Sequence, residues 1–211
     1  MCSSDLAVAK GGHRRLAIID LTTGDQPMQS HDGRFTIVFN GEIYNYVELQ
    51  AELRAKGAVL RTRSDTEVIL EAWRFWGKDC LVKFRGMFTF ALHDLADNSV
   101  VLARDPFGKK PLFYATTPLP SGEGLVFGSE VTALLEHPDI SAELDVASLH
   151  DFLCWRYVPA PNTFFRGIRK LVPGGMITWK AGIWHEEQYW VAPEATGGGT
   201  ARAVRPCRGL P

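Results

Sequence analysis

The sequence of 211 residues lacks the features that mark several large classes of protein. Its formal net charge is -1, from 23 basic and 24 acidic residues, so it carries no excess of positive charge for nucleic acid or for an anionic membrane. It has no apolar run long enough to span a bilayer and no N-terminal secretion signal. We therefore expect a cytoplasmic protein that binds neither nucleic acid nor membrane.

Cysteine is scarce as well, and none of the four cysteines forms a Cys-x-x-Cys pair. The spacing indicates neither a zinc site nor a disulfide framework. The six histidines are scattered, without a His-Glu-x-x-His pair. We expect no metal ion in this chain, and we expect Cys80 and Cys154 to be buried hydrophobic residues.

Hydrophobic residues make up 45% of the chain, which can supply the core of one large domain or two small ones. Asn45 with Glu48, and Ser64 with Glu67, form capping-box patterns that predict two helices, ended by Gly57 and Gly77. Two more helices are predicted over residues 130–137 and 147–157. Alternating and short apolar runs predict strands over residues 15–21, 34–40, 87–94, 99–104, 112–116 and 125–128, with a hairpin around 180–182. Helices combined with antiparallel strands favour the α+β class.

Four segments place polar residues where apolar runs end, namely residues 12–20, 40–45, 64–67 and 104–108. Taken in this order, from about Gly12 to about Trp190, they resemble the glutamine amidotransferase domain of glutamine-hydrolysing asparagine synthetases. This domain is a class II amidotransferase and an N-terminal-nucleophile (Ntn) hydrolase. In that family a cysteine directly after the initiator methionine attacks the side-chain amide of glutamine, forms a cysteinyl thioester and releases ammonia. A synthetase domain then uses the ammonia.

The resemblance implies a four-layer αββα sandwich of mainly antiparallel strands, here missing its first strands. Residues 1–6 are interpreted as a non-native leader and residues 7–157 as the amidotransferase domain, truncated at its N-terminus. Residues 158–193 are interpreted as an exit segment toward a missing C-terminal synthetase domain, and residues 194–211 as a disordered or frameshifted tail. ATP and Mg are expected only in that missing domain, and a homodimer is expected of the intact protein.

Cys2 stands at the nominal position of the nucleophile, but its surroundings differ from the family pattern. Residues 3–6 read Ser-Ser-Asp-Leu where the family has a Gly-Ile pair that opens a strand. The family also has several tens of residues before the His-Arg-Arg-Leu strand, whereas His13 follows almost at once here. We therefore interpret Cys2 as accidental and expect this chain to have no glutaminase activity.

Hydrolysis of an amide builds negative charge on its oxygen, and fixed hydrogen-bond donors aimed at that oxygen lower the barrier. The resemblance assigns this oxyanion hole to the Asn40 side-chain amide and the Gly41 backbone N–H. The alternative is that Asn40-Gly41 is a hairpin turn, which is the commonest use of this dipeptide.

Free glutamine also carries a carboxylate and an ammonium group, so a selective site needs one fixed cation and one fixed anion. The resemblance gives Arg15 the carboxylate and Asp65 the ammonium. Otherwise Arg15 is a surface charge at a strand end, and Asp65 only favours the positive end of its helix. The main-chain groups of the strand and one glutamate would line the rest of the site: Leu16, Ala17, Ile18, Ile19 and Glu42. Arg104 and Asp105 are expected to form a buried network around a tight turn, without a catalytic role.

Two other functions stay open. The chain could be a non-catalytic module that binds L-glutamine, or the glutaminase domain of another amidotransferase, of the exosortase-associated, glucosamine, glutamate or phosphoribosylamine type. No Ser-Gly-Gly-x-Asp-Ser pyrophosphate loop occurs in the sequence, so ATP use and an aspartate acceptor are expectations about a further domain.

Overall fold

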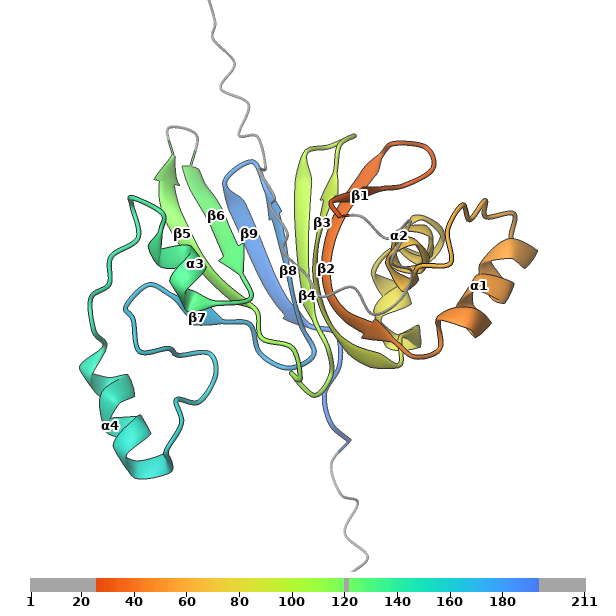
Figure 1. Ribbon diagram of the computed structural model, residues 1–211. Helices are drawn as coiled ribbons and strands as arrows, with labels where there is room; N and C mark the ends of the chain where they lie inside the picture. The colour runs from red at the N-terminus through yellow and green to blue at the C-terminus, as the bar shows by residue number, and fades with distance from the viewer. Residues whose placement is uncertain (1–25, 120–121, 194–211) are drawn as a thin grey trace, which may run out of the picture.

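Two antiparallel sheets lie face to face and carry helices on their outer sides (Figure 1). The structure, a computed structural model, describes residues 26–119 and 122–193. Helix α2 lies against the six-stranded sheet with α1 packed beside it, and α3 and α4 lie beyond the three-stranded sheet. Every strand pairing in these two ranges is antiparallel. The predicted α+β class and its four-layer αββα arrangement are confirmed.

The six-stranded sheet has the order β1-β2-β3-β4-β8-β9. Its strands are β1 (Met28–Gln29), β2 (Phe35–Ile43), β3 (Gly86–Asp94), β4 (Ser99–Arg104), β8 (Gly175–Lys180) and β9 (Ile183–Gln188). The three-stranded sheet has the order β6-β5-β7, from β6 (Gly122–Gly128), β5 (Phe113–Leu119) and β7 (Arg169–Lys170). Residues 158–193, predicted as an exit segment, therefore contribute β7, β8 and β9 to the two sheets.

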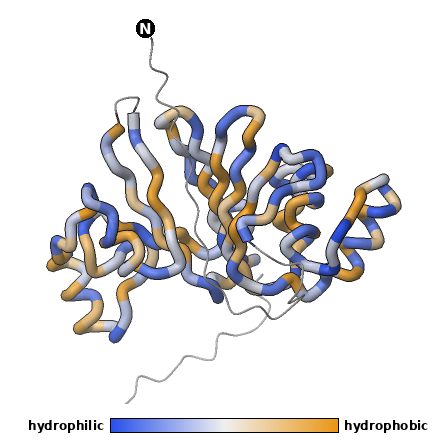
Figure 2. Tube along the Cα trace, turned by 45° about the horizontal axis from the view of Figure 1, so that its top comes forward, coloured by the Kyte–Doolittle hydropathy of each residue, from blue (hydrophilic) through white to orange (hydrophobic). Residues whose placement is uncertain are grey.

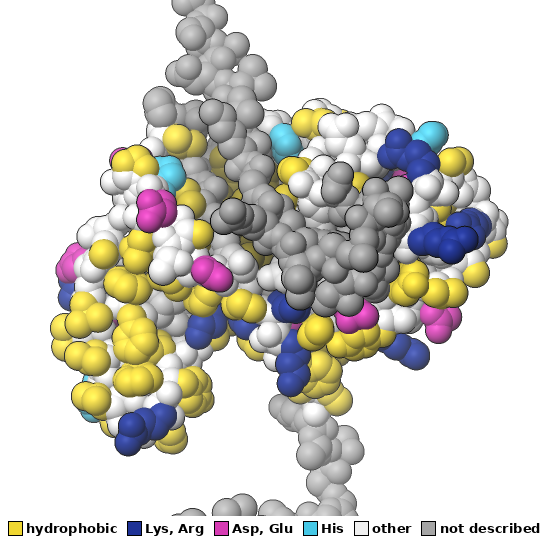
Figure 3. Space-filling view, in the orientation of Figure 1, with side chains coloured by type: hydrophobic (Ala, Val, Ile, Leu, Met, Phe, Trp, Pro, Cys, Tyr) yellow, Lys and Arg dark blue, Asp and Glu magenta, His cyan; other side chains and the backbone are white. Residues whose placement is uncertain are grey.

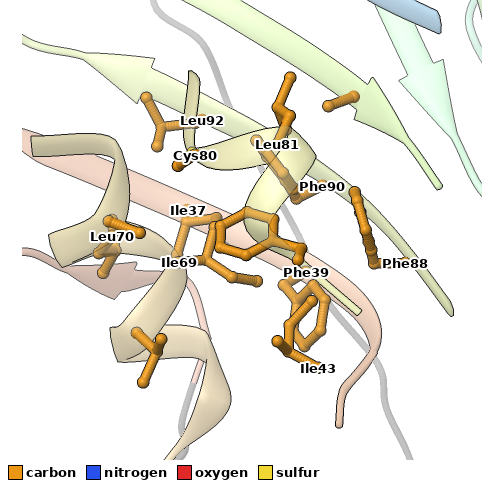
Figure 4. Close-up of a cluster of buried hydrophobic side chains, with 14 of the residues drawn as sticks. Ile37, Phe39, Ile43, Ile69, Leu70, Cys80, Leu81, Phe88, Phe90 and Leu92 are labelled. Atoms are coloured by element: carbon orange, nitrogen blue, oxygen red, sulfur yellow. The ribbon is translucent and has the colours of Figure 1, made fainter. Parts of the chain in front are cut away.

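The helices are α1 (Tyr46–Ala55), α2 (Asp65–Trp76), the 3₁₀ helix η1 (Gly77–Lys83), α3 (Val131–Leu135) and α4 (Val146–Trp155). Alternate residues of β2 point toward α2, as expected for a strand with one face on the core. Ile37, Phe39 and Ile43 of β2 pack with Ile69 and Leu70 of α2 in one buried cluster (Figure 4). This core fixes the beginning of α2 against the last residues of β2.

The two predicted capping boxes are only partly present. The Ser64 Oγ accepts a hydrogen bond from the Thr66 N–H at 3.1 Å, as a helix N-cap does, but the Glu67 carboxylate bonds the Arg61 and Thr62 N–H groups instead of returning to Ser64. The cap predicted at Asn45 is wrong. Its side chain makes no bond to α1; it donates to the Lys83 carbonyl and accepts from the Arg85 N–H. A long-range connection to the loop before β3 has replaced the local cap.

The two cysteines that the structure describes have different surroundings. Cys80 is fully buried in the core beneath α2, as expected. Cys154 is exposed, so its predicted burial is wrong. The physical reason is that α4 contacts little of the rest of the molecule: among its residues only Ser148 is buried.

Some predictions fall outside the described residues: the strand over 15–21, the leader 1–6 and the tail 194–211. None of the helices within residues 26–119 and 122–193 combines the length and the apolar character needed to cross a bilayer. In the same two ranges, no three His, Cys, Asp or Glu side chains gather in a way that could hold a metal ion.

Candidate active site

The open edge of β2 is the first structural feature of the candidate site. The Tyr44 N–H donates to the Arg85 carbonyl at 2.7 Å and the Leu95 N–H to the Arg34 carbonyl at 2.9 Å, so even-numbered residues of β2 exchange hydrogen bonds with β3. The odd-numbered N–H groups therefore point to the opposite edge. There β1 pairs only with Thr36 and Ile37, which leaves the edge beyond Ile37 without a neighbouring strand among the described residues.

Side chains occupy two of the donors on this edge. The Gln26 Oε1 accepts a hydrogen bond from the Phe39 N–H at 2.6 Å, and the Asp65 Oδ2 accepts one from the Ile43 N–H at 3.1 Å. The Gly41 N–H lies between them, and within the described ranges no hydrogen bond occupies it. A backbone N–H held in a fixed position is the kind of donor that an oxyanion hole uses.

Gly41 also has a conformation that only glycine adopts readily, with φ of +153°. A Cβ on Gly41 would lie 2.1 Å from the Met87 carbonyl oxygen, and a Cβ on Gly86 would lie 2.1 Å from the Glu42 carbonyl oxygen. The backbones of β2 and β3 thus approach each other too closely here for any side chain. Asn40-Gly41 lies inside a nine-residue strand, so the alternative of a hairpin turn is wrong.

Asp65 is the first residue of α2, and 2% of it is exposed. Its bond to the Ile43 N–H ties the start of α2 to the end of β2. The positive end of the helix also favours an ionised carboxylate at this position. The structure therefore brings Asp65 to the edge of β2 that carries the Gly41 N–H. The N–H that Asp65 accepts from belongs to Ile43, two residues after Gly41.

Asn40 and Glu42 lie on the other face of β2. They alternate with Phe39 and Ile43 and share their face with Val38, which packs against the core between the two sheets. Both residues are partly buried. The remaining predicted site residues lie outside the described residues: Cys2, Arg15, Leu16, Ala17, Ile18 and Ile19.

No motif in the sequence points to Gln26, a single glutamine before a proline in a predicted loop. Besides accepting from the Phe39 N–H, its side chain donates to the Thr66 Oγ1 at 3.4 Å. Gln26 thus joins the open edge of β2 to the first turn of α2. Its role depends on the register of β2, which no local pattern reveals.

The predicted network at Arg104 and Asp105 is present, but its hydrogen bonds go to the backbone. Asp105 is fully buried and its carboxylate accepts from the N–H groups of Phe107, Lys109 and Lys110 at 3.0 Å each, and of Phe88 at 3.2 Å. The Arg104 guanidinium donates to the carbonyls of Gly108, Lys110 and Leu171. Burial lowers the pKa of Arg104.

This network holds the part of β3 that lies beside the candidate site. Phe88, which Asp105 holds, is the residue of β3 directly opposite Gly41. The turn over residues 104–108 therefore fixes the segment of β3 against which Gly41 packs.

A cavity of about 670 Å³ lies elsewhere between the two sheets. Apolar residues from both sheets line it, together with His93, whose Nε2 lies 2.8 Å from the Asn98 Oδ1. Asn40, Gly41 and Asp65 are not part of its lining. Val38, which lines the cavity, shares a face of β2 with Asn40 and Glu42.

Comparison with known proteins decides the family. A family model described as a glutamine amidotransferase domain matches residues 3–190. The chain belongs to this family. The amidotransferase domain is 41% identical over 167 residues to asparagine synthetase [glutamine-hydrolyzing] 1 of Bacillus subtilis, a match that covers 79% of this chain and 26% of the relative. It is 38% identical over 182 residues to asparagine synthetase [glutamine-hydrolyzing] 3 of the same organism, covering 85% and 29%. The chain thus spans less than a third of the length of these curated relatives.

A solved structure supports the fold of the amidotransferase domain. The allosteric regulatory enzyme of purine biosynthesis matches with a TM-score of 0.52 at 21% identity, covering 77% of this chain and 30% of the other. The predicted Ntn-hydrolase type of sandwich is confirmed at the level of fold.

Proposed function

We propose that the chain is the glutamine-binding, ammonia-releasing part of an asparagine synthetase-like enzyme. In the complete reaction the C–N bond of the glutamine side-chain amide breaks, water supplies the oxygen of the new carboxylate, and the products are glutamate and ammonia. The observation that carries the proposal is the Gly41 N–H, which lies between two donors bonded by side chains, on the edge that Asp65 also reaches, and which no residue within 26–119 and 122–193 accepts from.

Each residue then has a separate task. The Gly41 N–H and the Asn40 side-chain amide stabilise the charge that develops on the amide oxygen. Asp65 binds the α-ammonium group, and Arg15 binds the α-carboxylate through its guanidinium fork. The main-chain groups of residues 16–19 and the Glu42 side chain line the remainder. The burial of Asp65 supports its task, because a charged pair gains strength where water is excluded.

The other part of the enzyme is a proposal drawn from the relatives. Their names and greater length support a synthetase domain joined to the amidotransferase domain. ATP and Mg²⁺ in that domain, and aspartate as the acceptor of ammonia, are what the family resemblance implies. A cytoplasmic location and a homodimer belong to the same proposal.

For this chain itself we infer binding of glutamine without turnover. The context of Cys2 supports this restriction, because residues 3–6 do not follow the family pattern after the nucleophile. The residues that this chain matches to the family then contribute positioning and the oxyanion hole. The same observation favours the second candidate function, a non-catalytic module that binds glutamine.

Calorimetry with L-glutamine tests the proposal. We expect the chain to bind glutamine and Asp65→Asn to weaken binding at least ~10-fold, equal to about 1.4 kcal/mol. Asparagine keeps an oxygen for the Ile43 N–H, so the variant removes mainly the charge. Asp139→Asn is the matched control, since the Asp139 side chain is 55% exposed on another part of the surface. A folded chain that shows no binding would refute the proposed site. Ammonia release that Cys2→Ala abolishes would refute the absence of turnover.

A further inference from the structure

The edge of β2 beside the candidate site carries N–H donors at alternate residues, and β1 occupies the first of them. Met28 faces Ile37 in the register of β1 and β2. Bonded positions of an antiparallel pair recur at every second residue, so the next such position joins residue 26 to Phe39. Gln26 therefore stands where the ladder between β1 and β2 would continue toward Gly41.

At this position the acceptor is a side chain and not a carbonyl of the main chain. The Gln26 Oε1 accepts from the Phe39 N–H at 2.6 Å, and the Gln26 Nε2 donates to the Thr66 Oγ1 at 3.4 Å. Thr66 is fully buried in the first turn of α2, so this end of the connection is shielded from water, where a hydrogen bond is stronger. We call Gln26 with its two hydrogen bonds the Gln26 bridge.

The Gln26 bridge gives α2 a second attachment to the edge of β2. The first attachment is the Asp65 carboxylate, which accepts from the Ile43 N–H at 3.1 Å. Gly41 lies midway between Phe39 and Ile43, so the start of α2 is tied to the strand on both sides of the Gly41 N–H. A single hydrogen bond would let the helix pivot about it, whereas two bonds at different points also fix its direction.

Apolar packing alone would hold the same elements with less control of direction. The side chains between β2 and α2 form a buried cluster, and Figure 2 shows hydrophobic colours along the strands of the sheets. The burial of apolar surface favours close contact but has no preferred direction. The two polar attachments therefore define where Asp65 lies relative to Gly41 more sharply than the core does.

We propose that Gln26 is a positioning residue that fixes the spacing between the Gly41 N–H and the Asp65 carboxylate. This inference rests on the proposed function, in which these two groups bind the amide oxygen and the α-ammonium group of one glutamine. Two residues of strand, about 6.6 Å, separate the Gly41 N–H from the N–H that holds Asp65. A ligand that must reach both groups gains from a fixed spacing, whereas a ligand that reaches only one of them does not.

Glutaramate separates these two cases. It is glutamine without the α-amino group, so it keeps the amide and the carboxylate but has no ammonium group for Asp65. Loss of the spacing should therefore weaken the binding of L-glutamine and leave that of glutaramate almost unchanged. A general loosening of the structure should weaken both ligands by the same factor.

The variants break the Gln26 bridge from either end. Gln26→Met removes both hydrogen bonds at nearly constant length and adds no charge, which matters because Figure 3 shows Lys and Arg side chains on the surface over α1 and α2. Thr66→Val breaks the bridge at α2, and Thr66→Ser keeps the hydroxyl group and should bind like the parent chain. Gln188→Met is the matched control, since Gln188 is an exposed glutamine at the end of β9 whose Nε2 donates to the Pro173 carbonyl.

Binding of both ligands to the 211-residue chain is measured by ligand-observed NMR, and urea unfolding shows that each variant is folded. We expect Gln26→Met to weaken L-glutamine at least ~5-fold, roughly the contribution of one hydrogen bond, and glutaramate less than ~2-fold. Thr66→Val should act in the same direction. The double variant should bind no more weakly than the weaker single variant, because both changes break one bridge.

Equal weakening of the two ligands would overturn the proposal, because Gln26 would then only support the fold. An unchanged affinity of Gln26→Met for L-glutamine would overturn it as well. If Gln26→Met does not fold, Thr66→Val gives the same comparison of the two ligands. A parent chain that binds neither ligand refutes the proposed function and this inference with it, whereas a parent chain that binds glutamine, with variants that behave like Gln188→Met, refutes only the role of Gln26.

Discussion

Replacing single glycines by alanine tests the close approach of β2 and β3 beside the candidate site. Gly86→Ala places a methyl group 2.1 Å from the Glu42 carbonyl oxygen, about 1.3 Å short of the 3.4 Å of ordinary contact. Gly41→Ala meets the Met87 carbonyl at the same distance and also forces alanine into a φ of +153°. Gly57→Ala has a φ of +90° but nothing within 4 Å of the new methyl group. The three variants therefore separate steric overlap from backbone conformation.

The expected losses of unfolding free energy follow from these differences. Gly57→Ala should cost about 1–2 kcal/mol, the usual penalty of a side chain in a left-handed conformation. Gly86→Ala should cost about 2–4 kcal/mol, because the strands must separate and weaken two or more ladder hydrogen bonds and the packing beneath them. Gly41→Ala combines both effects and should cost the most, roughly 3–6 kcal/mol.

Urea unfolding followed by tryptophan fluorescence measures all three variants in one assay. The reasoning is refuted if Gly86→Ala and Gly41→Ala are no less stable than Gly57→Ala. That result would mean that a methyl group fits between β2 and β3 at these positions. Glutamine calorimetry on folded Gly41→Ala adds a second readout. Binding should be lost there even in buffer conditions that keep the variant folded, because the added methyl group displaces the Gly41 N–H.

Three further predictions concern stability, acid and thiol chemistry. Asp105→Asn should lower the free energy of unfolding in urea by about 2–3 kcal/mol. The carboxylate accepts hydrogen bonds from four N–H groups, two at each oxygen, and the NH₂ group of asparagine cannot accept from the two that it faces. The hydrogen bond from Arg34 holds the pKa of the Asp94 carboxyl below its usual range. This pair therefore stabilises the fold above about pH 4, and the stabilisation is lost as the pH falls through the lowered pKa. Arg34→Ala should make the free energy of unfolding depend less on pH in the acid range. Burial raises the pKa of the Cys80 thiol, so Cys80 should resist a disulfide reagent at pH 8 in the native chain while Cys154 reacts, and equal rates would contradict its burial.

The elements that could be predicted are those whose signals are local. Phe35, Ile37 and Phe39 alternate with polar or smaller residues, and β2 forms there because this period matches a strand with one buried face. Ser64 begins α2 because its hydroxyl can satisfy a helix donor two residues away. Both features need only neighbouring residues.

The features that could not be predicted depend on residues far apart in the sequence. The Asn45 side chain forms hydrogen bonds with the backbone of Lys83 and Arg85, which lie about 40 residues later in the sequence. No residue near Asn45 predicts this contact. Gln26 lies at the candidate site because the register of β2 points the Phe39 N–H toward its side chain. Cys154 is exposed because no other described element packs against its side of α4. At the site itself the motif predicted Asn40, Gly41 and Asp65, but the position of the Gly41 N–H between the donors bonded by Gln26 and Asp65 is visible only in three dimensions.

The position of β8 and β9 in the larger sheet has a consequence for how the chain folds. β8 pairs with β4, although more than 70 residues separate them in the sequence, whereas β2, β3 and β4 form a meander with shorter connections. Pairings between distant segments close large loops and slow folding. During synthesis β4 must therefore stay an unprotected edge until the ribosome has delivered the last hairpin, and that interval is when the nascent chain is most prone to aggregate.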